Sequence, residues 1–201
     1  MGKTDPLSAY KKKRDFQQTA EPTGEEKITG RTKNRFVIQM HDARNLHFDF
    51  RLQIGDVLVS WAVPKGPSTD PDVKRLAIRT EDHPFAYGNF EGVIPEGAYG
   101  GGTVLIWDHG TFRNLRIEKK KNPMTLEESL EDGLIEVWLE GEKLEGGYAL
   151  IRTQKGENEK WLLKKIDDEK ADARRNPVST ERKSVVSGLG IDEIAGKAEH
   201  E

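Results

Sequence analysis

The sequence predicts a mainly β protein, either an antiparallel β-barrel or a β-sandwich, with few short helices. Short apolar runs of strand length recur along most of the chain, and glycine, proline and asparagine turn signals separate them. Helix signals are clear in only two segments. The 201 residues, 34% hydrophobic and 33% charged, suit one domain with a modest core and polar tails.

The N-terminal arm, residues 1–30, is polar and punctuated by Pro6, Pro22 and Gly24, so we expect it to be flexible and to order only in part. Residues 1–14 carry five basic side chains and one acidic side chain, a local charge of +4 (5 − 1) on a chain of net charge −3. This basic cluster could reach phosphates, or it could merely solvate the terminus.

Strand-length runs then define the main domain, residues 31–170. We expect its strands at 36–40, 46–52, 57–63, 75–79, 102–107, 134–139, 147–152 and 160–166. Turn signals at 54–56, 64–67 and 155–158 fit hairpins and tight loops between the strands.

Helices are expected in two places. Thr125 and Glu128 form a capping-box pattern that begins a short acidic helix, and Gly133 would end it. Residues 171–201 make a charged C-terminal segment with a short helix near 191–198, where Ile191 and Ile194 recur at helical spacing.

The stretch 41–52 carries most of the chemistry. Side chains alternate between the faces of a strand, so His47, Asp49 and Arg51 share one face while the apolar side chains at 48, 50 and 52 share the other. The apolar face would take the core, and the polar face would look into a cavity or groove. Two imidazoles, His41 and His47, with a carboxylate suit a first-row divalent metal, and the arginine suits an anion. The pattern predicts a metal-assisted phosphate site, although a lone strand histidine is often only a surface or core residue.

Composition excludes several classes of function. The chain has no cysteine, so it has no disulfide framework, thiol nucleophile or cysteine-rich zinc site. No apolar run approaches the roughly 20 residues that span a bilayer, and no signal-peptide core follows Met1. We therefore expect a cytoplasmic protein with no membrane partner.

Seven motifs along the chain carry further information. They stand at 11–16 (KKKRDF), 39–43 (QMHDA), 46–52 (LHFDFRL), 60–67 (SWAVPKGP), 81–84 (EDHP), 90–95 (FEGVIP) and 97–100 (GAYG). Together they resemble the phosphoesterase module of bacterial DNA ligase D and its free-standing bacterial and archaeal homologues, over residues 7–166. The resemblance implies a compact antiparallel β-barrel with short flanking helices, and a manganese-dependent 3′-phosphoesterase that heals DNA ends in nonhomologous end joining.

The resemblance also implies roles for individual residues. The metal ligands would be His41, His47 and Asp49, holding Mn²⁺, or Zn²⁺ or another first-row divalent ion. The catalytic residues would be Arg51, His83, Tyr87 and Glu81, of which the first two clamp the phosphate. The substrate-binding residues would be Arg14, Asp15, Glu21, Lys65 and Arg75.

Some of these residues also have plainer interpretations. Lys65 could be an exposed turn residue, Arg75 an edge charge, and His83, which precedes a proline, an exposed loop residue. The glycines of 97–102 resemble a phosphate cradle, but no Lys-Ser/Thr pair follows, so we interpret this segment as a tight turn.

The implied reaction has two steps at DNA 3′ ends. Cleavage of the terminal phosphodiester first removes a 3′-terminal ribonucleoside and leaves a 3′-phosphate. A phosphomonoesterase step then yields the 3′-hydroxyl. The substrates would include a primer–template with either kind of end, and a separate ligase, polymerase or end-binding protein could be a partner.

Two other classes of function compete with this hypothesis. An iron(II) oxygenase on a β-barrel could use His47, Asp49 and the distal His109 as its two-histidine, one-carboxylate set, which leaves His41 unexplained. A non-catalytic nucleic-acid-binding barrel could let the basic arm track the backbone. It would need exposed stacking aromatics, whereas the four tryptophans suit the core.

Overall fold

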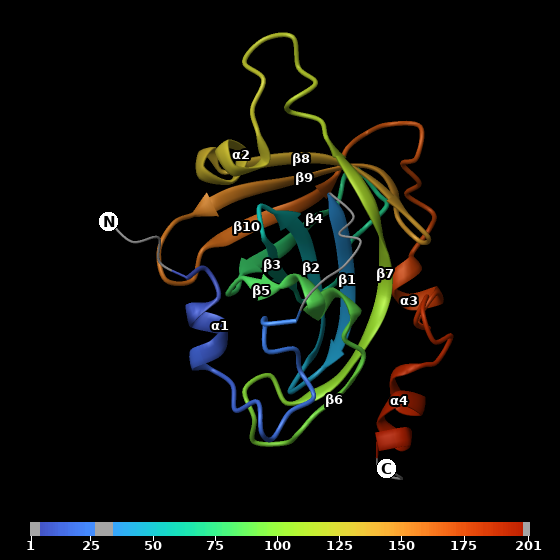
Figure 1. Ribbon diagram of the computed structural model, residues 1–201. Helices are drawn as coiled ribbons and strands as arrows, with labels where there is room; N and C mark the ends of the chain where they lie inside the picture. Colours follow the sequence, from blue (N-terminus) through green and yellow to red (C-terminus); the bar gives the residue numbers. More distant parts are fainter. Residues whose placement is uncertain (1–4, 27–33, 199–201) are drawn as a thin grey trace.

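A computed structural model, which describes residues 5–26 and 34–198, shows a closed antiparallel β-barrel (Figure 1). Within these residues, eight strands hydrogen-bond in the order β1-β2-β3-β4-β10-β9-β8-β7, and β7 pairs with β1 to close the ring. The strands are β1 Arg35–Asp42, β2 Leu46–Ile54, β3 Val57–Val63, β4 Lys74–Arg79, β7 Gly102–Asn114, β8 Leu134–Gly141, β9 Glu145–Gln154 and β10 Lys160–Lys165. The predicted mainly β fold is confirmed, and of the two predicted forms it is the barrel.

Each expected strand is present, and the largest difference in length concerns β7. The sequence predicts its end at 107, but the strand continues to Asn114 because residues 110–114 pair with β8. The polar and glycine residues at 108–110 resemble a turn signal. Instead, the β1–β7 register shifts between Ile38 and Gln39, which marks a bulge. A bulge bends the bulged strand and so assists the closure of a barrel.

Several short elements lie outside the sequence predictions. Strand β5 (His83–Pro84) pairs with β3, strand β6 (Gly92–Ile94) pairs with β7, and the 3₁₀ helix η1 (Phe85–Asn89) follows β5. Helices α1 (Ser8–Lys12) and α3 (Pro177–Thr180) are also new. Elements of this length carry too few residues to show a helical or strand period in the sequence.

Both expected helices are confirmed. Helix α2 (Leu126–Asp132) begins at the predicted capping box: the Thr125 hydroxyl accepts a bond from the Glu128 amide at 3.2 Å, and the Glu128 carboxylate accepts one from the Thr125 amide at 2.8 Å. Gly133 ends it with a φ of 88°, a left-handed conformation that glycine adopts without strain. Helix α4 (Ile191–Ala198) lies where the helical spacing predicts it.

The main core fills the inside of the barrel. All eight barrel strands contribute to it with side chains at alternate positions, such as Phe48, Phe50 and Leu52 of β2. The fully buried indoles in it are those of Trp61, Trp107 and Trp161. Trp138 is half-buried and is not part of this core, so the expectation that all four tryptophans suit the core is wrong for Trp138. The predicted division of β2 into an apolar core face and a polar face is therefore confirmed.

A second apolar cluster covers part of the outer surface of the barrel. Val37 of β1, Leu58 of β3 and Ile106 of β7 point outward, and Tyr10 of α1 and Phe85 of η1 pack against this side. Figure 1 shows β5 beside β3. The polar face of β2 thus lies outside the barrel, under a cover made by η1 and the N-terminal arm.

The two ends of the chain are tied to the barrel where the structure describes them. In the arm, the Glu21 carboxylate accepts a hydrogen bond from the hydroxyl of Tyr87 in η1 at 3.1 Å. In the C-terminal segment, Trp107 Nε1 donates to the Glu181 carbonyl at 2.7 Å. The predicted boundary after residue 30 lies outside the described residues, so the division into arm, domain and C-terminal segment stays a prediction. No helix formed by residues 5–26 or 34–198 has the length and apolar character needed to cross a membrane.

Candidate metal and phosphate site

Strands β1 and β2 bring the three candidate metal ligands together. His41 and His47 are direct partners in the antiparallel register, and Asp49 lies two residues further along β2 on the same face. His41 Nδ1 is 3.7 Å from one Asp49 carboxylate oxygen, and His47 Nε2 is 3.8 Å from the other. One ligand atom from each residue lies within 4.8 Å of the other two. The hairpin thus gathers three ligand types within reach of one ion.

The chemistry of these residues fits a divalent metal ion. His41 Nε2 is buried and has no hydrogen-bond partner among the described residues. His47 Nδ1 lies 2.9 Å from the Asn45 carbonyl oxygen, which can only accept a hydrogen bond, so Nδ1 carries the proton. The lone pair of His47 Nε2 is then available to bind a metal ion. Burial acts to raise the pKa of Asp49, but the Arg51 guanidinium and the two imidazoles hold that pKa well below its usual range. Imidazole nitrogen and a carboxylate are ligands that Mn²⁺ and Zn²⁺ accept.

Arg51 continues the polar face of β2 and is held by the protein on several sides. Its Nε donates to Gln39 Oε1 at 2.7 Å, its Nη1 to Ser60 Oγ at 2.9 Å and its Nη2 to Asp49 Oδ2 at 3.0 Å. Nη1 is also 2.9 Å from His83 Nδ1. With only 2% of its surface exposed, the guanidinium is fixed in place, and one Nη2 hydrogen has no partner within the described part of the chain.

His83 is enclosed by aromatic rings and by guanidinium groups. Its ring centre lies 5.2 Å from that of Tyr10 and 4.7 Å from that of Tyr87, both in edge-to-face geometry. Burial first, and then the positive charges of Arg51 and Arg14, hold the pKa of His83 well below its ordinary value. The imidazole is therefore neutral at pH 7.

The low pKa of His83 predicts that mild acid destabilises the fold. Below pH ~6.5 the unfolded chain takes up a proton at this position that the folded protein does not bind, so stability falls as the pH decreases. We expect the wild type to lose about 1 kcal/mol more unfolding free energy than His83→Asn between pH 7 and pH 5.5. Urea unfolding at both pH values measures this difference. Parallel losses in the two proteins would show that His83 does not stay neutral.

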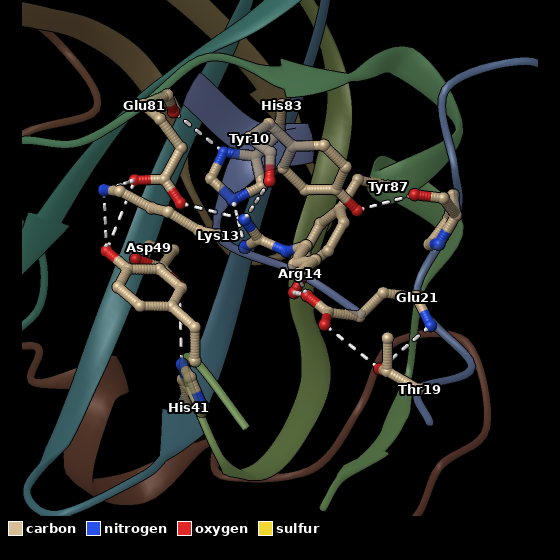
Figure 2. A network of polar contacts seen from close by, with 12 residues as sticks. Tyr10, Lys13, Arg14, Thr19, Glu21, His41, Asp49, Glu81, His83 and Tyr87 are labelled. Atoms are coloured by element: carbon tan, nitrogen blue, oxygen red, sulfur yellow. Dashed lines mark hydrogen bonds and ion pairs between the residues drawn. The ribbon is translucent and has the colours of Figure 1, made fainter. Parts of the chain in front are cut away.

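The N-terminal arm adds a second guanidinium from a distant part of the chain (Figure 2). Arg14 Nε donates to Glu21 at 2.9 Å, Arg14 Nη1 donates to Glu81 at 3.0 Å, and Arg14 Nη2 is 3.4 Å from His83 Nε2. The Tyr87 hydroxyl donates to the same Glu21 carboxylate at 3.1 Å. These contacts fix the arm across the outer face of β2 and place Arg14 beside His83.

Glu81 is held as an anion in this network. Burial acts to raise its pKa, but hydrogen bonds from its own backbone amide, from Lys13 and from Arg14 bring the pKa below its usual range. An ionised carboxylate accepts hydrogen bonds and donates none. Glu81 thus accepts hydrogen bonds from Arg14 and Lys13, and its predicted catalytic role stays a prediction.

A cavity of about 150 Å³ lies between the candidate metal ligands and the arm. The predicted site residues that line it are Arg14, His41, His47, Asp49, Arg51, Glu81, His83 and Tyr87. Glu21 is not among the described residues that line it, but it accepts a hydrogen bond from Arg14. The structure does not bring the other predicted residues here: Lys65 and Arg75 line a separate hollow beside β4, and the exposed Asp15 side chain accepts bonds from residues 17 and 18. A binding role for these three stays a prediction.

The structure adds site residues that the sequence interpretation leaves without a role. Gln39 Nε2 donates to the carbonyls of Tyr87 and Phe90 at 3.1 and 2.8 Å, which ties β1 to η1 while its Oε1 holds Arg51. The sequence could have indicated Gln39, because Gln39 lies two residues before His41 and therefore on the same face of the strand. Ser60 has no such signal, because only the β2–β3 register places it opposite Arg51.

Comparison with known proteins gives a consistent result. The profile of the DNA ligase D 3′-phosphoesterase domain matches residues 39–152. This segment contains the candidate metal ligands, Arg51 and His83. It ends within β9 and excludes the arm.

Curated relatives match more of the chain. A Pseudomonas aeruginosa protein named multifunctional non-homologous end joining protein LigD is 46% identical over 173 residues, which is 85% of this chain and 20% of the relative. A Mycobacterium tuberculosis protein named multifunctional non-homologous end joining DNA repair protein LigD is 43% identical over 166 residues, 83% of this chain and 20% of the relative. A Mycolicibacterium smegmatis protein with the first of these names is 44% identical over 167 residues, 83% of this chain and 21% of the relative. The chain thus spans about a fifth of the length of these relatives.

Proposed function

The chain belongs to the DNA ligase D 3′-phosphoesterase domain family, and from this premise we propose that it is a metal-dependent enzyme that restores 3′-hydroxyl ends on DNA. The proposed substrates are a DNA strand with a 3′-terminal ribonucleoside and a DNA strand with a 3′-phosphate. The observation that carries the proposal is the cavity in which a possible metal-ligand group faces Arg14, Arg51 and a neutral histidine.

The ligand group supports metal dependence. A divalent ion held by His41, His47 and Asp49 would supply Lewis-acid chemistry at a phosphoryl oxygen. Mn²⁺ is the proposed ion, and Zn²⁺ or another first-row divalent metal is compatible with the same donors.

The remaining residues suit the charge of the substrate. Arg51 keeps one Nη2 hydrogen for a phosphoryl oxygen, and Arg14 adds a second positive charge beside His83. Both guanidinium groups are fixed before substrate binds, so they need no reorganisation as negative charge develops on the phosphoryl oxygens. Gln39, Ser60 and Glu81 act as positioning residues, because they contact the guanidinium groups directly.

In the diester step, water adds to phosphorus, and the bond from phosphorus to the 5′ oxygen of the terminal ribonucleoside breaks. The departing oxygen takes a proton, so the products are a free ribonucleoside and a 3′-phosphate. In the monoester step water again adds to phosphorus, the bond from phosphorus to the 3′ oxygen breaks, and that oxygen takes a proton, which yields inorganic phosphate and the 3′-hydroxyl. His83 is the candidate for proton transfer, since its buried neutral ring can accept a proton from water and pass it to the departing oxygen.

The competing hypotheses find less support in the geometry. His109 pairs with Glu142 at 3.5 Å and is not among the described residues that line the cavity, whereas His41 completes the ligand group. A passive stacking surface would need several exposed aromatics, but Trp61, Trp107 and Trp161 are buried in the barrel and Trp138 is half-buried. Both observations favour hydrolysis of a phosphate ester.

The relatives' printed names concern non-homologous end joining, and we extend this to the chain as a proposal. Its DNA ends would come from that repair process, with a separate ligase, polymerase or end-binding protein as a partner. A DNA substrate would also require the protein to be in the compartment that holds the genome. In bacteria, the source of the relatives, this compartment is the cytoplasm, which is therefore the proposed location.

An assay of the purified chain tests the proposed function. A primer–template with a 3′-ribonucleotide should yield a 3′-phosphate and then a 3′-hydroxyl, and one with a 3′-phosphate should yield the 3′-hydroxyl directly. Activity should require added Mn²⁺ or another divalent ion and should vanish with a chelator. Absence of both products across Mn²⁺, Zn²⁺, Co²⁺ and Mg²⁺ titrations would contradict the proposal.

A further inference from the structure

Two larger hollows adjoin the candidate cavity. One of about 580 Å³, lined by the arm and residues 156–159, shares Thr80, Glu81 and Tyr99 with it. The other, of about 1060 Å³ and lined by residues of β6 and α4, shares Ala43, Ile94 and Gly100 with it. A phosphodiester at the cavity has a nucleoside on either side of its phosphorus, and each needs a space of its own.

Tyr99 forms the wall between the cavity and the smaller hollow. It lies on the turn between β6 and β7, where Gly97 and Gly100 adopt left-handed φ angles of 86° and 78°. Despite its place beside the candidate metal ligands, its side chain is 47% exposed, the largest apolar surface left open at this site among the described residues. The turn thus carries an aromatic ring to the rim of the cavity instead of into a core.

The Tyr99 ring is held at its hydroxyl end. Lys13 Nζ donates to the hydroxyl at 3.1 Å, and the hydroxyl donates to Glu81 at 3.4 Å. Lys13 Nζ also lies over the ring, 4.6 Å from its centre, and the Arg14 guanidinium carbon lies 5.4 Å from the same centre. A ring that these contacts hold in place while Tyr99 stays 47% exposed is preorganised to stack on a planar group.

The smaller hollow has the wrong charge for a DNA backbone. Its charged lining residues are Lys13, Arg79, Glu81, Asp82, Glu157 and Glu159. Both cations already have partners, since Lys13 pairs with Glu81 and Arg79 pairs with Asp82. Glu159 pairs with Arg152, so within the described residues Glu157 is the carboxylate of this lining without an ion pair; it would repel phosphates but can accept hydrogen bonds from sugar hydroxyls.

The larger hollow differs in having a cation without an ion pair. Its charged lining residues are Asp42, Arg44 and Glu96, and Arg44 is exposed and has no ion pair within residues 5–26 and 34–198. A free guanidinium suits the phosphates of a continuing DNA strand. The larger hollow therefore suits the side of the scissile phosphate that carries the rest of the DNA strand with its phosphates. The smaller hollow suits the other side, which carries a single uncharged nucleoside.

We propose that Tyr99 is the stacking residue of a subsite for the departing 3′-terminal ribonucleoside, located in the hollow of about 580 Å³ that it borders. The base stacks on the Tyr99 ring, and the ribose hydroxyls face the carboxylates. This inference rests on the proposed function and deepens it. It gives Tyr99 a role in the diester step. The monoester step does not need this role, because a 3′-phosphate has no departing nucleoside.

Kinetics with matched substrates test the subsite. In Tyr99→Ala, the ratio of kcat/KM for the 3′-ribonucleoside substrate to kcat/KM for the 3′-phosphate substrate should fall about tenfold, the size expected for one lost base–aromatic stack. Tyr99→Phe keeps the ring and should largely restore the ratio. Ile117→Ala is the control, because Ile117 is 48% exposed at a loop remote from the cavity lining, and it should leave the ratio unchanged. Equal losses on both substrates in Tyr99→Ala would overturn the subsite.

A substrate change tests the stacking itself. When the terminal ribose carries no base, the wild type should lose about the same factor as Tyr99→Ala, and Tyr99→Ala should lose little more. Rapid cleavage of the baseless substrate by the wild type would overturn the proposal.

A binding measurement separates this inference from the proposed function. A primer–template that ends in a 2-aminopurine ribonucleoside should lose fluorescence on binding to the wild type and to Tyr99→Phe, but not to Tyr99→Ala, even in the presence of a chelator. Quenching without hydrolysis would contradict the proposed function and keep the subsite. Hydrolysis of the 3′-phosphate substrate without quenching would keep the function and overturn the subsite.

Discussion

Replacing His47 with alanine is expected to abolish Mn²⁺-dependent hydrolysis of both kinds of 3′ end while leaving the barrel folded. His47 shares the ligand group with His41 and Asp49, so its loss removes one of three protein ligands. Loss of a single electrostatic contact to a transition state costs ~10²–10³-fold, and we expect loss of a ligand to cost at least the upper end of that range. The imidazole is 22% exposed and packs outside the main core, so folding should persist.

Two readouts make this prediction specific. Titration with Mn²⁺, followed by calorimetry or by the electron paramagnetic resonance of the ion, should show weakened binding in His47→Ala. Thermal unfolding monitored by circular dichroism should show the wild-type fold. The matched control is His109→Ala, because His109 pairs with Glu142 away from the cavity and should keep both activities and the metal. Full activity of His47→Ala would contradict the ligand assignment.

Arg51→Lys is expected to lower the rate on both substrates by ~10²-fold or more, with the metal still bound. A lysine ammonium keeps the charge but cannot reach Gln39, Ser60 and Asp49 in the fixed directions of the guanidinium. The phosphate would then meet a mobile point charge instead of a preorganised donor. Because the charge is retained, Asp49 keeps a partner, and the loss should appear mainly in kcat.

Arg51→Ala should behave differently from the lysine variant. It leaves the buried Asp49 without its closest cation, and breaking a buried ion pair in this way costs ~3–5 kcal/mol of stability. Urea unfolding of both variants, beside steady-state kinetics, separates the catalytic loss from the structural one. Arg113→Lys is the matched control, since Arg113 is about half exposed and pairs with Glu118 far from the site. A lysine variant at position 51 with wild-type kcat would contradict the fixed-donor picture.

Local patterns in the chain were sufficient to predict the strands of the barrel and both longer helices. The reason is visible in β2, where polar side chains at His47, Asp49 and Arg51 alternate with apolar ones. Alternation depends only on the geometry of an extended backbone, so it is readable before any partner strand is known. The capping box at Thr125 is equally local, because both of its hydrogen bonds lie within four residues.

The candidate metal group was predictable for a related reason. His41 and His47 are six residues apart, and a hairpin brings such residues opposite each other. Roles for Lys65 and Arg75 depend on the family resemblance alone, and the structure places these side chains in another hollow. The sequence does not show that Lys65 and Arg75 lie apart from the metal-ligand group, because their distance from it depends on how β3 and β4 are placed in the closed barrel.

The cover of the site depends on packing between distant segments. Arg14 meets Glu81 across 67 residues of sequence, and Tyr10 reaches His83 only because α1 docks on the outer face of the barrel. The polar composition of residues 1–30 has no periodic pattern that would predict the docking of α1 on the barrel. Strand period and caps arise from neighbours along the chain, whereas the contacts of Arg14 and Tyr99 arise from burial and charge pairing that exist only after the barrel has closed.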